Sequence, residues 1–348
     1  MPTETGRTEG LPRAVLGRSN VEVTRFGFGG APLGSVATTP EGRETAAATL
    51  AAAWDEGVRT FDVAPFYGLG RAERAVGGWL AGRPRDEFVL STKVGRIIDA
   101  DGQGFTWDFS ADGVRRSLDA SLERLGLDRV DVALIHDPDN HVTEALEGAY
   151  PALEELRSQG VVRAIGFGMN HADPLERFVR DTDIDCVLVA GRYSLLDDRA
   201  AAGLLPAAAE RGVGILVGGV FNSGVLAAPG PEATFNYHQA PPGIVARAEA
   251  IRAFLEARGV PLTAAAEQYP LRHPAVTAIL VGGQTPAEVH ADVEALRTPI
   301  PEDVWAELER SGLLGWRDDE AAGSGGGAPG GGGSGDRAAT DATGRSGA

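Results

Sequence analysis

Eight short apolar runs alternate with helix-like stretches along most of this chain, and no other feature constrains the fold as strongly. The runs are residues 23–29, 58–62, 88–93, 130–136, 161–167, 186–189, 213–217 and 276–281. Most neighbouring runs are separated by one amphipathic stretch, such as residues 111–125, where apolar side chains recur at helical spacing. Eight strand–helix units in succession predict an α/β fold, the (β/α)8 or TIM barrel, with parallel strands inside and helices outside.

The two ends of the chain differ from this repeating region. Residues 1–10 are polar and are expected to be flexible, and residues 319–348 form a Gly/Ser-rich tail that is expected to be disordered. The barrel is therefore expected over residues 11–318. At its start, the segment from Val15 to Val23 contains a turn at residues 17–20 and predicts a hairpin that closes the N-terminal end of the barrel.

Charge and cysteine content exclude several kinds of partner. The 348 residues carry a formal net charge of −17 and the pI is about 4.8, so the surface repels nucleic acid and anionic membranes. Cys186 is the single cysteine, which rules out an intramolecular disulfide and fits a reducing cytoplasm. No apolar run has membrane-spanning length, and the N-terminus lacks the apolar core of a signal peptide. We expect a cytoplasmic protein that acts on a small molecule, in an oligomeric state that the sequence leaves open.

Three of the apolar runs end in an ionisable residue. Asp62, Lys93 and His136 close the second, third and fourth runs, and Tyr67 lies in the loop after the second run. Because barrel enzymes hold their active sites at the carboxyl ends of the strands, these side chains are expected to lie together at one rim. Taken singly, such residues are usually a loop anchor, a solvated charge or a structural histidine. Their joint placement at consecutive strand ends favours a catalytic group.

These four residue types suit one kind of chemistry. The ordinary pKa of a tyrosine is about 10, and a nearby ammonium such as Lys93 lowers the pKa of Tyr67. Asp62 would hold the ammonium in place, and His136 can orient a carbonyl or hydroxyl group. The set suits proton transfer at an oxygen whose carbon gains or loses a hydride, which the side chains cannot supply, so a redox cofactor is implied. The scattered histidines offer no plausible ligand set, and no metal site is predicted.

Three segments around these residues resemble the signature segments of the aldo-keto reductases. They read FDVAPFYG at residues 61–68, STKVG at 91–95 and LIHDPD at 134–139, and the resemblance extends from about residue 16 to residue 312. It implies a barrel that binds an extended nicotinamide cofactor, with Tyr67 as the general acid/base, Lys93 and Asp62 tuning it, and His136 orienting the substrate. Residues 27–34 and 64–70 most resemble the aldose 1-dehydrogenase branch, which includes L-fucose, L-galactose and D-threo-aldose dehydrogenases.

The resemblance and the rim positions together assign further contacts. The expected cofactor-binding residues are Gly30, Ala31, Asp62, Asn170, Gly218, Phe221, Asn222, Gly224, Gly283, Gln284, Thr285, Glu288 and Asp292. The expected substrate contacts are Phe66, Trp107 and Asp137. The nicotinamide pocket departs from the family pattern at three places: Asn170 stands one position late, Ala190 replaces a common glutamine, and glycines at 218–219 replace an aromatic residue.

The segment after the last apolar run favours NAD over NADP. The ribose 2′-phosphate of NADP needs basic residues, and the family commonly supplies one where this chain has Gln284. Glu288 and Asp292 follow on one helix face, where carboxylates accept ribose hydroxyls and repel a phosphate. The start of that helix still offers amides to an anion, and Arg272 or Arg297 could approach from nearby, so NADP remains possible.

Two long connections are placed where they can cover the rim. Residues 227–243 are rich in Pro and Gly and, with residues 221–224, predict a lid over the cofactor on which Phe235, Tyr237 and His238 face the ligand. An idle surface insertion is the alternative. The connection at residues 97–110 carries Trp107 and is either a substrate wall or a surface loop with a self-packed aromatic residue.

Three functions are consistent with the sequence. The first is a nicotinamide-dependent dehydrogenase that oxidises the hemiacetal carbon of an aldose, or a related aldehyde or alcohol. The second is an NADPH-dependent general reductase of aldehydes and ketones. The third is a catalytically silent barrel that senses a cofactor, and the intact set of four rim residues argues against it. The sequence names neither the sugar nor the physiological direction.

Overall fold

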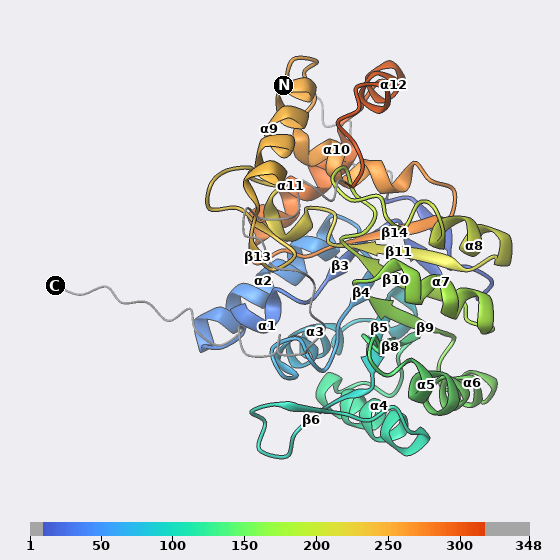
Figure 1. Cartoon of the computed structure of the whole chain (residues 1–348). Coiled ribbons are helices and arrows are strands. Elements are labelled where there is room, and N and C mark those ends of the chain that lie inside the picture. The colour runs from blue at the N-terminus through green and yellow to red at the C-terminus, as the bar shows by residue number, and fades with distance from the viewer. Residues whose placement is uncertain (1–9, 317–348) are drawn as a thin grey trace.

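The barrel predicted from the sequence is present and closed. The computed structural model describes residues 10–316, so the termini that were expected to be flexible or disordered lie outside the described residues, apart from residue 10. The barrel strands are β3 (Phe26–Gly29), β4 (Thr60–Asp62), β5 (Val89–Val94), β8 (Val132–His136), β9 (Ala164–Met169), β10 (Cys186–Ala190), β11 (Gly214–Gly218) and β14 (Val276–Val281). They form one parallel ring in the order β10–β11–β14–β3–β4–β5–β8–β9 (Figure 1). Each predicted apolar run therefore contributes one strand of the barrel.

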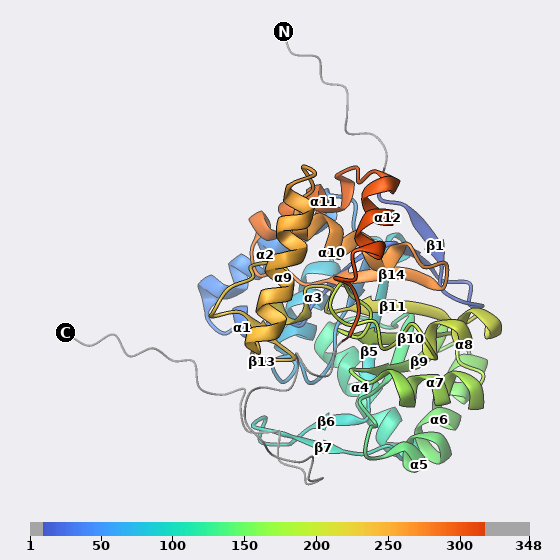
Figure 2. The ribbon, with the colours of Figure 1, turned by 45° about the horizontal axis from the view of Figure 1, so that its top comes forward.

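Helices surround the ring on the outside (Figures 1 and 2). They are α1 (Leu33–Val36), α2 (Pro40–Asp55), α3 (Arg71–Leu80), α4 (Ala111–Leu125), α5 (Val142–Glu144), α6 (Tyr150–Ser158), α7 (Ala172–Asp181), α8 (Leu204–Arg211), α9 (Pro242–Glu256), α10 (Leu262–Leu271), α11 (Pro286–Arg297) and α12 (Glu302–Arg310). Three short helical turns are η1 (Arg85–Glu87), η2 (Ala145–Ala149) and η3 (Asn222–Gly224). The side chains of Thr39 and Ser110 cap α2 and α4, and Gly126 and Gly212 end α4 and α8 in the left-handed conformation.

The predicted N-terminal hairpin is also present. Strand β1 (Arg13–Val15) pairs antiparallel with β2 (Glu22–Thr24), so the first apolar run is divided between this hairpin and β3. Leu16 and Val21 are fully buried and pack with the side chains that fill the inside of the barrel. Gly17 lies so close to the barrel that a Cβ atom there would be 2.0 Å from the Asp185 carbonyl oxygen. The hairpin thus closes the N-terminal end of the barrel, opposite the rim that carries the strand-end residues.

Both long connections at the other rim contain hairpins that the sequence did not predict. Strand β6 (Arg96–Ile98) pairs with β7 (Phe105–Trp107), and β12 (Thr234–Phe235) pairs with β13 (His238–Gln239). In Figures 1 and 2, the β6–β7 hairpin lies on the side of α4, and α9 lies on the opposite side of the barrel.

A second apolar cluster lies beyond the barrel and includes residues of α9, α10 and α12. Phe235 belongs to this cluster, is 4% exposed and stacks on Trp316, so the expectation that it faces a ligand is wrong. Phe235 packs strand β12 against this cluster. Because β12 has only two residues, its sequence shows no alternation from which the burial of Phe235 could be predicted.

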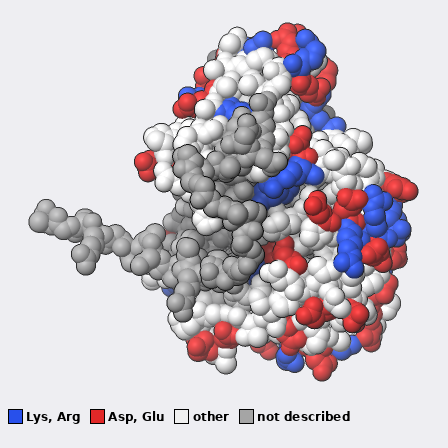
Figure 3. Space-filling view, in the orientation of Figure 1, with Lys and Arg blue, Asp and Glu red and all other residues white. Residues whose placement is uncertain are grey.

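The surface carries both signs of charge. Acidic and basic side chains are interspersed over the face seen in Figure 3. Within residues 10–316, no helix combines the length and apolar character that crossing a bilayer requires.

Candidate active site

The structure brings the four predicted rim residues together. Asp62 and His136 are the last residues of β4 and β8, Lys93 lies one residue before the end of β5, and Tyr67 lies in the turn before α3. The Lys93 ammonium donates to Asp62 Oδ2 at 2.6 Å and to the Val63 carbonyl at 2.9 Å. Lys93 Nζ lies 4.6 Å from the centroid of the Tyr67 ring, and the Tyr67 and His136 ring centroids are 5.9 Å apart. Parallel strands that end at one rim therefore place residues far apart in sequence within a single site.

Burial controls the protonation of this group. Asp62, Lys93 and His136 are 3%, 1% and 5% exposed. Burial raises the pKa of Tyr67 to about 12, because it outweighs the lowering effect of the Lys93 ammonium. The expectation that Lys93 brings the pKa of Tyr67 below its usual value is thus wrong in net direction, although Lys93 acts in the expected sense. Burial also disfavours the Lys93 ammonium, but Asp62 and Tyr67 more than offset this and raise the pKa of Lys93.

His136 is neutral at physiological pH. Burial, followed by the positive charges of Arg96 and Lys93, holds the pKa of His136 well below its ordinary value. A neutral imidazole can donate one ring N–H to a substrate oxygen without carrying a charge. The site therefore combines a cation, a protonated phenol and a neutral hydrogen-bonding ring. No group of three or more His, Cys, Asp or Glu side chains within residues 10–316 could hold a metal ion.

Two buried polar atoms of the four predicted rim residues have no hydrogen-bond partner within residues 10–316. They are Asp62 Oδ1 and His136 Nδ1. Buried polar atoms ordinarily have a partner. Asp62 Oδ1 therefore fits a ligand hydroxyl group, such as one from the ribose of a dinucleotide.

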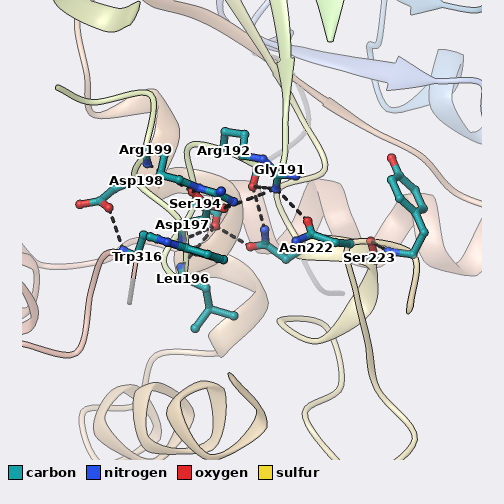
Figure 4. Close-up of polar contacts among 12 residues, drawn as sticks. Gly191, Arg192, Ser194, Leu196, Asp197, Asp198, Arg199, Asn222, Ser223 and Trp316 are labelled. Atoms are coloured by element: carbon teal, nitrogen blue, oxygen red, sulfur yellow. Dashed lines mark hydrogen bonds and ion pairs between the residues drawn. The ribbon is translucent and has the colours of Figure 1, made fainter. Parts of the chain in front are cut away.

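A polar network ties together the loops that follow β10 and β11 (Figure 4). Asn222 Nδ2 donates to the Gly191 carbonyl at 3.1 Å, and the Ser194 hydroxyl donates to Asn222 Oδ1 at 2.5 Å. The Asn222 side chain is thus engaged within the protein, which leaves its backbone for the cofactor contact expected of it. Arg192 Nη1 donates to Asn236 Oδ1 at 2.8 Å and links this network to the β12–β13 turn.

The β12–β13 turn reaches over the rim. Asn236 and Tyr237 have φ values of 50° and 65°, as in the two-residue turns that match the twist of a hairpin. Tyr237 is 75% exposed, and the nearby side chain of Asn170, which follows β9, acts to lower the pKa of its hydroxyl, although burial raises that pKa overall. Two residues expected to contact a ligand, Asn170 and Tyr237, therefore lie together at the mouth of the barrel.

The expected glycine contacts divide into two kinds. A Cβ atom at Gly30 would lie 2.8 Å from Val63 Cγ1 and 3.0 Å from the Asp62 carbonyl oxygen. Glycine at this position therefore allows the loops after β3 and β4 to pack closely against each other. At Gly218, by contrast, a Cβ atom would meet only ordinary contacts, the nearest at 3.6 Å.

The start of α11 is fixed by its own side chains. The Thr285 hydroxyl accepts the Glu288 N–H at 3.3 Å, and Glu288 Oε2 accepts the Gln284 N–H at 2.8 Å. Burial, together with Glu288, raises the pKa of Asp292 to about 7. The Glu288 carboxylate thus accepts the Gln284 N–H, which is one of the backbone amides that a phosphate at this helix start would otherwise bind.

The three expected substrate residues lie on the His136 side of the mouth. The Phe66 ring is edge-on to His136 at a centroid distance of 6.3 Å, and Asp137 Oδ2 lies 3.6 Å from His136 Nε2. Trp107 stacks on Phe109 at 5.6 Å, so the aromatic residue of this connection is indeed packed within it. The same ring also contacts Arg96, which donates to Asp137, so the connection borders this ion pair and its role as a substrate wall stays a prediction.

Sequence reasoning missed Arg96 and Arg192. Arg96 follows Lys93 by three residues, and Arg192 comes two residues after the end of β10, so both stand at strand ends like the predicted residues. From sequence alone, an arginine just after a strand is usually interpreted as a charge exposed to solvent. Only the hairpins that fold back onto the rim turn these two side chains inward, and neither hairpin was predicted.

Comparison with known proteins identifies the family. The Aldo/keto reductase family model matches residues 25–312. This chain belongs to the aldo/keto reductase family. It is similar to D-threo-aldose 1-dehydrogenase from Pseudomonas sp, with 41% identity over 85% of this chain and 96% of the relative. It is also similar to pyridoxal 4-dehydrogenase from Microbacterium luteolum, with 39% identity over 87% of this chain and 98% of the relative.

The fold comparison agrees with the sequence comparison. An aldo-keto reductase from Bacillus halodurans in its holo form superposes with a TM-score of 0.74 and 26% identity, covering 90% of this chain and all of that chain. The chain is therefore an oxidoreductase of a family that uses nicotinamide cofactors, and the unpartnered Asp62 Oδ1 is compatible with such a group.

Proposed function

We propose that this enzyme oxidises the hemiacetal carbon of an aldose, or a related aldehyde or alcohol, with NAD as the preferred cofactor. The observation that carries the proposal is the buried Lys93–Asp62 ion pair beside Tyr67, with a neutral His136 facing the same space. The two relatives described above, one named for an aldose and the other for pyridoxal, support the substrate class.

Each of the four residues has a defined part in this reaction. His136 donates an N–H to the hydroxyl oxygen of the reacting carbon and orients it. Tyr67 takes the proton of that hydroxyl as the hydrogen on the carbon leaves with its electron pair, and a cyclic hemiacetal becomes a lactone. Lys93 stabilises the phenolate form of Tyr67 that must exist before the proton moves, and Asp62 holds Lys93. A bound nicotinamide ring supplies the acceptor for the hydride.

The preference for NAD rests on charge at the start of α11. Gln284 occupies the position where a basic residue would meet a 2′-phosphate, and Glu288 lies beside it. The two arginines that could have compensated are paired elsewhere: Arg272 with Glu302 at 2.9 Å and Arg297 with Glu56 at 2.6 Å.

A substrate panel tests the proposal. L-Fucose, L-galactose, D-arabinose and pyridoxal are each offered with NAD and with NADP, and reduced nicotinamide is followed by its absorbance. We expect oxidation of at least one aldose, with a higher kcat/KM for NAD than for NADP. Faster reduction of simple aldehydes with NADPH than any sugar oxidation would overturn the proposal in favour of a general reductase. Cofactor binding without any turnover would instead indicate a silent barrel.

A single substitution tests the cofactor assignment. Gln284→Arg adds a cation at the start of α11, so kcat/KM for NADP should rise relative to NAD by about tenfold or more. Gln159→Arg, which makes the same change at the exposed end of α6, serves as the matched control and should leave the ratio unchanged. If the ratio of kcat/KM for NADP to kcat/KM for NAD is the same in both variants, residue 284 does not contact the ribose of the cofactor.

A further inference from the structure

An ion pair stands directly beside His136 and has no part in the proton transfer described above. Arg96, the first residue of β6, donates to Asp137 Oδ2 at 2.8 Å, and the same oxygen lies 3.6 Å from His136 Nε2. The side chains of Arg96 and Asp137 are 11% and 21% exposed. The pair is thus mostly buried but still reaches the mouth of the barrel.

Aromatic rings hold the Arg96 side chain. Its Cζ atom lies 4.3 Å from the centroid of Phe66, 4.4 Å from that of Trp107 and 5.1 Å from that of Phe105. Cation–π contacts of this kind fix the plane of a guanidinium without neutralising it. Arg96 is therefore held in place before any substrate arrives, and it positions the Asp137 carboxylate in turn.

The backbone of Asp137 is set to aim its side chain at the rim. Its φ is 42°, in the left-handed region, and its N–H donates to the Gly168 carbonyl at 2.9 Å. Aspartate, asparagine and glycine tolerate this conformation better than other residues. Burial raises the pKa of Asp137 while Arg96 opposes the change. A pocket for simple aldehydes has no use for such a pair, because hydrophobic residues of similar volume would fill the wall at no desolvation cost.

We propose that the Arg96–Asp137 pair recognises hydroxyl groups next to the reacting carbon and so selects sugars over unsubstituted hemiacetals and aldehydes. This inference rests on the proposed function, because it takes His136 as the residue that holds the reacting oxygen. The 3.6 Å between His136 Nε2 and Asp137 Oδ2 lets the two residues bind neighbouring oxygens of one carbon chain. Asp137 accepts from the hydroxyl on the adjacent carbon, and Arg96 donates to the same or the next oxygen.

The pair should discriminate strongly. A site built to hydrogen-bond a substrate hydroxyl rejects an analogue without that hydroxyl, because the buried polar groups are left unpaired. Tetrahydropyran-2-ol is the matched analogue: it is a cyclic hemiacetal with the reacting carbon of an aldopyranose and no other hydroxyl group. The wild-type enzyme should prefer L-fucose or L-galactose to this analogue by about 10²-fold or more in kcat/KM.

Two variants at Asp137 and one control separate recognition from structure. Asp137→Gly removes the carboxylate and suits the left-handed backbone, and Asp137→Asn keeps the shape without the charge. Asp139→Asn is the control: it removes a carboxylate from the same loop, but one that pairs with His171. Folding is checked by thermal unfolding, and NAD affinity by fluorescence.

Asp137→Gly should lower kcat/KM for the sugars by about 10²-fold and leave kcat/KM for tetrahydropyran-2-ol within about threefold of the wild-type value. Asp137→Asn should lower kcat/KM for the sugars by less than Asp137→Gly does. Asp139→Asn should behave like the wild-type enzyme on both substrates. An equal loss on sugar and analogue, or no loss on either, overturns the inference and leaves the proposed function standing. Equal kcat/KM of the wild-type enzyme for the sugars and for the analogue would also overturn the inference and leave the proposed function standing. If the wild-type enzyme oxidises neither the sugars nor the analogue, the proposed function itself is overturned, and this inference with it.

Discussion

The buried ion pair between Lys93 and Asp62 is the residue-scale feature on which the active site depends. Both side chains are almost inaccessible, and their 2.6 Å contact compensates part of the cost of taking two charges out of water. Removing one partner leaves the other charge buried and uncompensated, which typically costs about 3–5 kcal/mol. The pair is therefore a structural necessity as well as a means of tuning Tyr67.

Lys93→Met should change the pH dependence of oxidation. Tyr67 acts as a base only after losing its proton, so the rate rises with pH toward the pKa of Tyr67, which is about 12. Because Lys93 lowers that pKa, its removal should raise the pKa and move the alkaline rise to higher pH. The measurement is kcat/KM against pH, with Lys93→Arg as the variant that keeps the cation. An active Lys93→Met enzyme with a wild-type pH profile would contradict the coupling.

The sequence predicted the members of this site better than their electrostatics. Asp62, Lys93 and His136 were found because each ends an apolar run, and a strand end fixes a position in space. The net pKa shift of Tyr67 was wrongly predicted, since burial is the larger cause and depends on every element around the ring. Arg96 was missed because it acts through the β6–β7 hairpin, which brings long-range contacts that no local pattern encodes.

The connections at the rim are where prediction of elements was weakest. Each barrel strand overlaps an apolar run of four to seven residues, whereas β12 and β13 have two residues each and β7 has three, with no such run around them. Strands this short show no periodicity that can be told from a loop. Their positions are set instead by tertiary contacts, such as the bond from Arg192 to Asn236 and the packing of Phe235.

Residues 221–224 and 227–243 are expected to form a lid, which predicts that a bound cofactor protects them from hydrogen exchange. The β12–β13 turn is joined to the rim through Ser223 and Arg192 and carries the exposed Tyr237. We expect NAD to increase amide hydrogen-exchange protection of these residues, because a ligand beneath them suppresses local opening. The opposite hairpin tip at residues 99–104 is the internal control. Equal protection with and without NAD would indicate an idle insertion.

For the whole molecule, alternation of runs and helices was enough to predict a closed barrel, because eight consecutive units leave few other topologies. The second apolar cluster, with α12 and the segment up to Trp316, was not predicted. It joins residues that are more than a hundred positions apart, as in the bond from the Trp316 N–H to Asp198. Such contacts appear only once the chain has folded.

Global stability should depend on Glu267, an unpaired acid in α10. It is fully buried, neither carboxyl oxygen has a partner within residues 10–316, and burial together with Asp292 raises its pKa to about 10. The folded state therefore keeps a proton that the unfolded state loses above its ordinary pKa of about 4.3. Stability falls as pH rises between these two values, by up to about 1.4 kcal/mol per pH unit.

Glu267→Gln removes this titration and keeps the shape of the side chain. Thermal unfolding should show the variant gaining more in Tm over wild type at about pH 8 than at about pH 5. Glu249→Gln, an exposed position on α9, is the control and should show no such difference. A gain for Glu267→Gln that does not grow with pH would mean that the carboxyl group is ionised in the folded protein.

The central claim, that Tyr67 transfers the proton in a nicotinamide-dependent oxidation of a sugar, is tested most directly by the turnover of Tyr67→Phe. The substitution removes one oxygen and leaves the ring packed against Lys93 and His136. With NAD and the best aldose of the panel, kcat should fall by about 10²–10⁴-fold while NAD affinity and thermal stability stay near the wild-type values. Retention of more than about a tenth of wild-type turnover would contradict the account.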